Sequence, residues 1–414
     1  KNKLVIISNK LMKLTASDIK NEGEFKVYGV VSHVRELGSK KFIIITDGKD
    51  ILQVVYEGNK RVKRGDSISA VGNAFFDKRA PRGIELRAKN IEILNEIKEE
   101  SFDEWSIKRM SLDKKIKYRS ISLRIPEFYK IFEIYAKVTH YFREFFINLG
   151  YLEIFTPKVV KMGTESGAEV FSILYFDKEA FLAQSPQLYK QMMLASGLKG
   201  VFEFGHYYRA EASKTKRHLT EFYCLDVEIN YVESLDDVMK VLEDAIKYVL
   251  EKFNLKIEKI PILTFDEAKE ILERNGIKTK KDLTTEGEKF IGDYVKENFN
   301  SDFVFITEFP FDAKPFYVMK KDDGKSYSFD LLFKGLEIVS GAKREHRYEI
   351  LINQIKEKKI NPERMYWYLE TFKHGIPPHG GFGLGIDRFV KQMLNLDDIR
   401  ECVLYPRDPD TLEP

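Results

Sequence analysis

The segments that decide the fold of this 414-residue chain are VFEFGHYYR at residues 201–209 and EFYCLDVEINYV at residues 221–232. In the second segment apolar and polar residues alternate, which is typical of a β-strand with two unlike faces. The alternation places Asp226 and Glu228 on one face, with apolar residues behind it. The two segments therefore predict an antiparallel strand pair in a domain of the α+β class, without the regular βαβ alternation of a doubly wound sheet.

A polar stretch at residues 212–220 separates the two predicted strands. Arg209 and Glu211 lie two positions apart just before it, so we expect them to share a face of the first strand. The stretch carries four basic or titratable side chains, Lys214, Lys216, Arg217 and His218. Such a loop is suited to gripping a polyphosphate. The alternative is a charged hairpin tip, and the pattern alone favours that alternative.

The sequence GFGLGIDR at residues 381–388 has glycine at every second position, followed by an arginine. It matches neither the dinucleotide fingerprint GxGxxG nor the phosphate-binding GxxxxGK[ST] loop. Alternate glycines leave one face of a strand bare, so that a flat ligand can lie on the backbone. Arg388 would then begin a helix and could reach an anionic group. The alternative is close packing of a strand on a helix.

Two acidic residues, Asp330 and Glu337, flank a short segment that contains Gly335. A tight reversal there would place the two carboxylates opposite each other across a hairpin. Paired carboxylates beside a phosphate site commonly hold Mg²⁺, whose remaining ligands are water and phosphate. Taken alone this is a weak signal, because acidic residues flank many hairpins.

The first quarter of the chain has a different pattern. Five short alternating segments, separated by glycine-rich turn signals, are predicted as strands at 25–34, 41–46, 51–56, 67–76 and 84–94. Residues 1–95 carry 19 Lys and Arg against 11 Asp and Glu, whereas the rest of the chain carries 49 against 54. Five strands in a basic segment predict an OB-type barrel that binds single-stranded nucleic acid. A lysine-rich solvated surface is the alternative explanation of the charge.

Composition excludes several classes of protein. No apolar run approaches the roughly 20 residues that a membrane-spanning helix needs. The two cysteines, Cys224 and Cys402, lie far apart without a partner spacing, which argues against a disulfide scaffold and a cysteine-based zinc site. We therefore expect a cytoplasmic protein in a reducing compartment.

Three regions are expected along the chain. Residues 1–95 would form the barrel, residues 96–125 a charged hinge or linker, and residues 126–414 the large domain, with a helical insertion at about 262–300. The large domain begins with apolar residues at helical spacing from Glu127 onward, and Gly150 is a suitable C-terminal cap for that helix.

Together and in order, these segments resemble the signature motifs of the class II aminoacyl-tRNA synthetases. Residues 155–157, Phe-Thr-Pro, resemble motif 1, whose proline lies at the dimer interface in that family. Residues 209–222 resemble motif 2, and residues 381–388 resemble motif 3. With an OB barrel in front, the chain is most similar to subclass IIb and within it to the aspartyl enzymes of the archaeal and eukaryotic type. The resemblance implies a homodimer that uses ATP and Mg²⁺.

The resemblance also implies roles in the use of ATP. The residues expected to contact ATP are Arg209, Glu211, Arg217, His218, Leu219, Phe222, Glu337, Gly385 and Arg388. Arg209 and Arg388 would be the catalytic residues, because they stabilise charge at the phosphates rather than supply a nucleophile. The residues expected to hold Mg²⁺ are Asp330, Glu337 and Ser340.

The sequence FLAQSPQLYKQ at residues 181–191 resembles the aspartate-recognition segment of that family. The implied aspartate-binding residues are Glu165, Ser185, Gln187, Lys190, Asp226, Ser340 and Arg344. Lys190 and Arg344 would hold the side-chain carboxylate. Two buried cations would be left uncompensated by the neutral amide of asparagine, so they predict aspartate as the substrate.

For the barrel the resemblance implies a surface that reads the tRNA anticodon. The residues that match the family's readers are Arg35, Phe42, Gln53 and Glu85. Aromatic platforms of this kind stack on unpaired bases. Val30 and Ser32 depart from the family's usual residues at positions that separate the aspartate anticodon from that of asparagine, and Pro81 lies in a loop implicated in that choice. The expected partners are thus L-aspartate and tRNA(Asp), with tRNA(Asn) open as a second acceptor.

Two alternatives remain at this point. An asparagine–tRNA ligase is disfavoured by Lys190, which those relatives lack. A non-catalytic RNA-binding paralogue is disfavoured by Arg209, Glu337 and Arg388, because an inactive site has no physical need for that set of charges.

Overall fold

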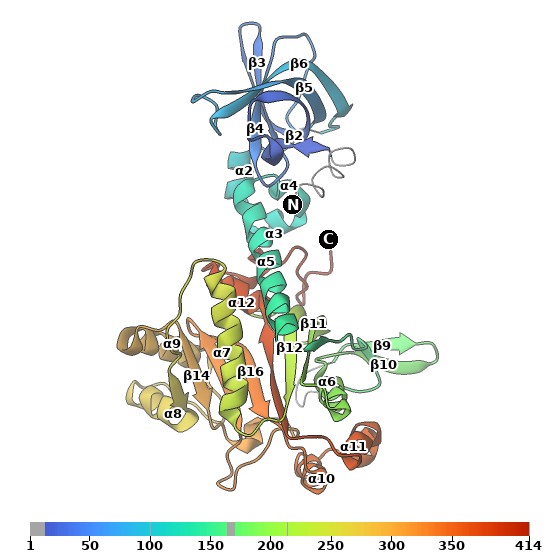
Figure 1. Ribbon diagram of the computed structural model, residues 1–414, viewed down its shortest axis with the longest axis vertical. Helices are drawn as coiled ribbons and strands as arrows, with labels where there is room; N and C mark the ends of the chain where they lie inside the picture. The colour runs from blue at the N-terminus through green and yellow to red at the C-terminus, as the bar shows by residue number, and fades with distance from the viewer. Residues whose placement is uncertain (1–12, 100, 164–169, 213, 414) are drawn as a thin grey trace. The chain divides into compact units, whose positions relative to one another are not determined.

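The computed structural model describes residues 13–99, 101–163, 170–212 and 214–413 (Figure 1). The chain forms two compact units that divide between Ile134 and Tyr135, inside helix α5 (Pro126–Asn148). Gly150, just beyond α5, has a φ of +79°, the left-handed conformation expected of a C-terminal cap.

The first unit contains a closed barrel of five main strands. Their bounds are β2 (Gly23–Leu37), β3 (Lys40–Thr46), β4 (Ile51–Tyr56), β5 (Ser67–Phe76) and β6 (Ile84–Asn95). The order is β2-β3-β4-β6-β5, and pairing of β2 with β5 closes the barrel, while the two-residue strand β1 (Leu14–Thr15) adds to β2. All five strands expected from the sequence are confirmed, with ends within three residues of the prediction.

Alternation along the barrel strands separates core from surface. In β4, Leu52 and Val54 are buried while Gln53 between them points outward, and in β3 Ile43 is buried beside the half-buried Phe42. The expected nucleic-acid readers thus lie on the outer side of the strands whose other side builds the core.

Residues 96–125, expected as a hinge or linker, contain helices. They are α2 (Glu104–Arg109), α3 (Leu112–Lys117) and α4 (Arg119–Ser122). Ile107 and Ile116 are buried on α2 and α3, so this charged segment has an apolar side.

The second unit is built on a mainly antiparallel sheet of eight strands. They are β7 (Leu152–Glu153), β11 (Gly200–Tyr208), β12 (Glu221–Asn230), β13 (Ile262–Thr264), β14 (Phe303–Thr307), β15 (Ser328–Phe333), β16 (Leu336–Lys343) and β17 (His379–Gly385). Their order is β13-β14-β15-β16-β17-β12-β11-β7. The pairing of β11 with β12 confirms the antiparallel pair expected from the sequence.

Helices and a small sheet surround the large sheet. The helices of this unit beyond α5 are α6 (Gln187–Met193), α7 (Leu235–Glu251), α8 (Phe265–Arg274), α9 (Thr285–Phe299), α10 (Tyr348–Glu357), α11 (Tyr366–Lys373) and α12 (Ile386–Met393). The small sheet consists of β8 (Val159–Val160), β9 (Ser172–Tyr175) and β10 (Lys178–Leu182). Helices α7, α9 and α12 pack against the large sheet, and α7 runs across its face in Figure 1. Among the described residues, no helix is both long and apolar enough to cross a membrane.

A β-bulge between β15 and β16 prepares the site. Leu331 pairs with Val339 but Leu332 pairs with Glu337, so Ile338 is an extra residue on β16. Side chains alternate along a regular strand, and positions 337 and 340 would then face opposite sides. The bulge resets the alternation, so that Glu337 and Ser340 line the same cavity.

Candidate active site and nucleic-acid surface

A cavity of about 350 Å³ in the second unit gathers most of the predicted site residues. Its walls contain Ser185, Gln187, Arg209, Glu211, Arg217, His218, Leu219, Phe222, Asp226, Asp330, Glu337, Ser340, Arg344, Gly385 and Arg388. These residues come from four separate stretches of the sequence, which the sheet brings together. Glu165 lies outside the described residues.

Arg209 lies just beyond the end of β11, which stops at Tyr208, so the expectation that Arg209 and Glu211 share a face within that strand was wrong. The backbone N–H of Arg209 donates to the carbonyl oxygen of Thr220 at 2.9 Å, which extends the hairpin by one bond. Its guanidinium lies over the ring of Phe222, 5.2 Å from the centroid. The buried Nε of Arg209 has no partner among the described residues, so a donor is left available for an anionic ligand.

His218 lies close to the positively charged side chains of Arg388, Arg217 and Arg209. Burial, followed by the nearby Arg388, lowers its pKa to about 4. Its Nδ1 lies 2.7 Å from the hydroxyl of Thr215. At neutral pH the imidazole is therefore uncharged and contributes a hydrogen bond to the cavity rather than a positive charge.

The backbone of Glu337 is held from both sides. Its N–H donates to Oε2 of Glu288 at 3.1 Å, and its carbonyl oxygen accepts from Nη1 of Arg388 at 2.9 Å. Glu288, on α9, also accepts from Nη2 of Arg217 at 2.6 Å. Burial and the charge of Glu337 raise the pKa of Glu288 to about 7. The sequence did not single out Glu288, because no local pattern connects α9 with β16.

The expected arrangement of Asp330 and Glu337 was wrong in detail. Glu337 pairs across the hairpin with Leu332, and Asp330 pairs with Ser340, so the two carboxylates are not directly opposite each other. Both oxygens of Asp330 accept from Nζ of Lys314, at 3.0 and 2.9 Å. Burial nevertheless raises the pKa of Asp330, and the charge of Glu337 adds to the rise.

This donor set fits a Mg²⁺ ion that arrives with a triphosphate. No group of three or more His, Cys, Asp or Glu side chains within the described ranges could hold a metal on its own. Mg²⁺ commonly uses only one or two protein carboxylates and completes its shell with water and phosphate. Glu337 and Asp330 are the carboxylates at one wall, and Asp330 could bind the ion once its two contacts with Lys314 are released.

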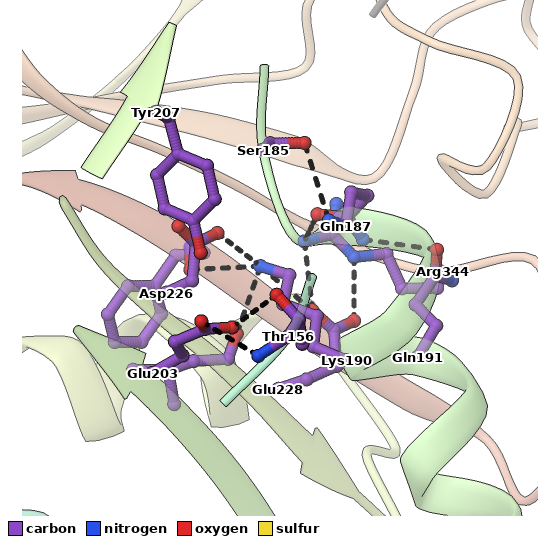
Figure 2. Close-up of polar contacts among 12 residues, drawn as sticks. Thr156, Ser185, Gln187, Lys190, Gln191, Glu203, Tyr207, Asp226, Glu228 and Arg344 are labelled. Atoms are coloured by element: carbon purple, nitrogen blue, oxygen red, sulfur yellow. Dashed lines mark hydrogen bonds and ion pairs between the residues drawn. The ribbon is translucent and has the colours of Figure 1, made fainter. Parts of the chain in front are cut away.

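Lys190 lies behind the cavity, with a side chain only 1% exposed. Figure 2 shows its Nζ between two carboxylates, 3.0 Å from Oδ1 of Asp226 and 3.2 Å from Oε2 of Glu228. It also donates to the carbonyl oxygen of Phe382 at 3.2 Å. Lys190 is thus charge-paired within the protein, so the expectation that a neutral substrate side chain would leave it without a counter-charge was wrong.

Arg344 shares one of these carboxylates and reaches the cavity wall. Its Nε donates to Oε1 of Glu228 at 2.8 Å, and its Nη2 lies 3.4 Å from Oε1 of Gln187 (Figure 2). Arg344 lowers the pKa of Glu228 against the effect of burial. Glu228 was not among the predicted site residues, although the alternation that placed Asp226 on the polar face placed Glu228 there too.

The sequence offered two explanations for the glycines of β17, a bare face for a ligand and close packing, and each explanation applies to a different glycine. A Cβ on Gly381 would lie 2.2 Å from Oε2 of Glu228, so close packing requires that glycine. Gly385 lines the cavity, and a Cβ there would have no neighbour nearer than 3.8 Å. Arg388, in the first turn of α12, lines the same cavity, as expected.

A second cavity, of about 1060 Å³, lies on the barrel. All four expected anticodon readers, Arg35, Phe42, Gln53 and Glu85, are among its lining residues. Gln53 donates to Oε2 of Glu85 at 2.9 Å, and Arg87 donates to Oε1 of Glu85 at 3.0 Å. Both carboxylate oxygens of Glu85 therefore have a fixed partner, which orients this side chain on the surface.

The family of the protein follows from comparison with known proteins. A family model described as class II tRNA synthetases (D, K and N) matches residues 111–409, and one described as an OB-fold nucleic acid binding domain matches residues 25–94. The chain belongs to the class II tRNA synthetases, and it is an enzyme of the aminoacyl-tRNA synthetase type.

Individual relatives and a solved structure show which members of the family are similar to this chain. The chain is 41% identical to the aspartate–tRNA(Asp/Asn) ligase of Aeropyrum pernix, over 95% of this chain and 96% of that one. It is 42% identical to the aspartate–tRNA(Asp) ligase of Pyrococcus furiosus, over 95% and 97%. The crystal structure of the Pyrococcus horikoshii asparaginyl-tRNA synthetase with asparaginyl-adenylate matches with a TM-score of 0.88 at 29% identity, over 98% of this chain and 100% of that one.

Proposed function

We propose that this protein is an aspartate–tRNA ligase, which activates L-aspartate with ATP and transfers it to the 3′ end of tRNA. The observation that carries the proposal is the single cavity in which Arg209, Arg388 and Arg344 meet. Relatives about 40% identical over nearly the whole chain are aspartate–tRNA ligases, which supports aspartate over asparagine.

In the first reaction an oxygen of the aspartate α-carboxylate attacks the α-phosphorus of ATP, and pyrophosphate leaves. The residues act by positioning and by stabilising charge, so no protein nucleophile is needed. Arg209, with its unpartnered Nε, holds the α-phosphate, and Phe222 stacks on adenine. Arg217 and His218 meet the outer phosphates. In the second reaction the 3′-hydroxyl of tRNA attacks the carbonyl carbon of the adenylate, and AMP leaves.

Mg²⁺ accompanies ATP in this proposal. Glu337, Asp330 and Ser340 would hold it, and when bound it would neutralise charge that develops on the phosphates. For Asp330 to take part, its contacts with Lys314 must give way.

Aspartate recognition rests on a balanced group of charges. Arg344 lies on the cavity wall and meets the side-chain carboxylate of the substrate directly. Lys190 lies behind Asp226 and balances the two buried carboxylates, so that Arg344 keeps its positive end toward the substrate. Ser185 and Gln187 complete the pocket, and Glu165 is proposed to receive the substrate ammonium group.

Aspartate-dependent pyrophosphate exchange tests this proposal. With ATP and Mg²⁺ present, labelled pyrophosphate should enter ATP when L-aspartate is added and not when L-asparagine is added. Exchange that depends on asparagine alone would identify the other amino acid as the substrate and overturn the proposal.

The barrel is proposed to read the anticodon through Arg35, Phe42, Gln53 and Glu85, which share one cavity. We further propose tRNA(Asp) as the acceptor, with tRNA(Asn) as a second acceptor, because the relatives include ligases of both kinds. Charging purified tRNA(Asp) and tRNA(Asn) side by side decides between one acceptor and two.

A homodimer is also proposed, with Pro157 at its interface. In support, the neighbouring Phe155 is 82% exposed, and Ile147 and Leu152 are about half exposed. Contiguous exposed apolar side chains commonly mark an interface. Sedimentation at micromolar concentration should give a mass of two chains.

The remaining proposals concern domains and compartment. Residues 1–95 are taken as the anticodon-binding domain, 96–125 as the hinge and 126–414 as the catalytic domain with its insertion at about 262–300. The enzyme is placed in the cytoplasm, and the free thiols of Cys224 and Cys402 support a reducing compartment.

A further inference from the structure

Glu288 makes a contact that none of the sequence motifs explains. It belongs to α9, within the helical segment that interrupts the strands of the second unit, and its side chain is 9% exposed. One oxygen, Oε2, accepts both from Nη2 of Arg217 at 2.6 Å and from the backbone N–H of Glu337 at 3.1 Å. This buried oxygen therefore links Arg217 to β16, the strand that carries Glu337.

The helix that carries Glu288 is seated closely against this hairpin. A Cβ on Gly292, one turn further along α9, would lie 2.4 Å from the backbone nitrogen of Gly335 in the β15–β16 turn. Glycine on both sides allows the two backbones to approach to this distance. The position of Glu288 relative to Glu337 is thus set by backbone packing rather than by a flexible side-chain contact.

The contact leaves part of Arg217 available to a ligand. Nη2 is engaged by Glu288, whereas the buried Nε of Arg217 has no partner within the described part of the chain. The side chain of Arg217 is only 15% exposed and lines the cavity. An arginine held by one end presents its other donors in a fixed direction, and less side-chain freedom is lost when an anion binds.

We propose that Glu288 is a positioning residue that orients Arg217 toward the outer phosphates of ATP. This inference rests on the proposed function only in assigning a nucleoside triphosphate to the cavity. It predicts that removal of the Glu288 carboxylate weakens the binding of ATP, whose outer phosphates Arg217 would contact. The binding of AMP, which lacks those phosphates, should stay unchanged.

Nucleotide binding by the full-length protein tests the inference directly. Dissociation constants for ATP with Mg²⁺ and for AMP should be measured by calorimetry for the wild type, E288A and E288Q. E288A should bind ATP about three- to tenfold more weakly, because the arginine must now be ordered during binding, while AMP affinity stays the same. E288Q should recover ATP affinity, because its amide oxygen can still accept from Arg217.

A double-mutant cycle separates positioning from a purely structural role. In the R217A background, E288A should cause no further loss of ATP affinity. The inference is overturned if E288A weakens ATP and AMP equally, if it changes neither, or if its effect is the same with and without Arg217. Aspartate-dependent exchange by the wild type reports separately on the proposed function, so failure of one conclusion is distinguishable from failure of the other.

Discussion

Lys190 and Asp226 form a buried ion pair, with 3.0 Å between Nζ and Oδ1 and at most 7% of either side chain exposed. With Glu228 and Arg344 the group contains two cations and two carboxylates, so its charges balance. A balanced buried group adds little stability compared with apolar side chains of the same volume, but loss of one member leaves a buried charge without compensation. Each member of the group is therefore sensitive to the loss of another.

Replacement of Lys190 by methionine should lower both stability and activity. In K190M, Asp226 and Glu228 keep only one cation between them. We expect the free energy of unfolding to fall by about 3–5 kcal/mol. Aspartate-dependent pyrophosphate exchange should disappear. Urea denaturation and the exchange assay measure the two effects.

Lys240 provides a matched control, because it forms an exposed ion pair with Asp244 on α7. K240M should change stability by less than about 0.5 kcal/mol, since exposed helical pairs contribute little. The double variant K190M/D226N should regain part of the lost stability without regaining exchange. Wild-type exchange in K190M would show that the buried lysine has no part in selecting aspartate.

Two glycines of β17 should respond differently to alanine. G381A would bring a Cβ to 2.2 Å from both Oε2 of Glu228 and the carbonyl oxygen of Val227, and that backbone cannot move easily. We expect a loss of about 3 kcal/mol or more in unfolding free energy. G385A meets nothing nearer than 3.8 Å, so its stability should stay within about 1 kcal/mol of the wild type.

Because Gly385 lines the cavity, G385A should instead raise the KM for ATP in pyrophosphate exchange. Thermal denaturation and exchange kinetics on the same two preparations distinguish the packing glycine from the ligand-facing one. Equal destabilisation by the two substitutions would contradict this division.

The strands were predictable because their signal is local. Alternation in β3 and β4 depends only on neighbouring residues, so the strands themselves could be predicted. Phe42 and Gln53 were assigned to one surface by resemblance to the family, and the pairing of β3 with β4 agrees with that assignment. Alternation could also have found Glu228, which occupies the polar face two positions from Asp226.

The contacts that tune the site were not predictable from sequence, since they depend on distant segments. Glu288 reaches Glu337 across 49 positions, and Lys314 reaches Asp330 across 16, with no periodicity that links them. The extra residue Ile338 was missed for another reason. A bulge depends on how two strands pair, and neither strand alone carries a signal for it.

Phe42→Ala should weaken tRNA charging without affecting aspartate activation. Phe42 is half-buried on the lining of the barrel cavity, where it can stack on an unpaired base. One stacked base contributes about 1–3 kcal/mol, so kcat/KM for tRNA should fall by about 5- to 150-fold. Exchange without tRNA should be unchanged.

Phe76 is the matched control, because it is 63% exposed at the end of β5 and is not among the residues that line the cavity. F76A should charge tRNA at the wild-type rate. A similar defect in both variants would indicate a general disturbance of the barrel rather than the loss of a stacking platform.

The buried His379 should make stability depend on pH. Pro377 offers only a carbonyl oxygen, 2.9 Å from Nδ1 of His379, so Nδ1 donates and Nε2 accepts from the amide of Gln191 at 3.0 Å. Burial lowers the pKa of His379 from 6.5 to about 4. Between pH 4 and pH 6.5, His379 is protonated in the unfolded chain and neutral in the folded chain. Stability is therefore fully present above pH 6.5 and is lost as the pH falls toward 4.

The expected loss from this one group is about 3 kcal/mol over that interval. Denaturant unfolding at pH 7 and pH 4.5 should show a smaller difference for H379Q than for the wild type, by about 2–3 kcal/mol. H374Q should keep the wild-type difference, because the side chain of His374 is 78% exposed. If H379Q and the wild type lost the same free energy between the two pH values, His379 would not titrate below its ordinary range, and the hydrogen bonds assigned to its two nitrogens would be wrong.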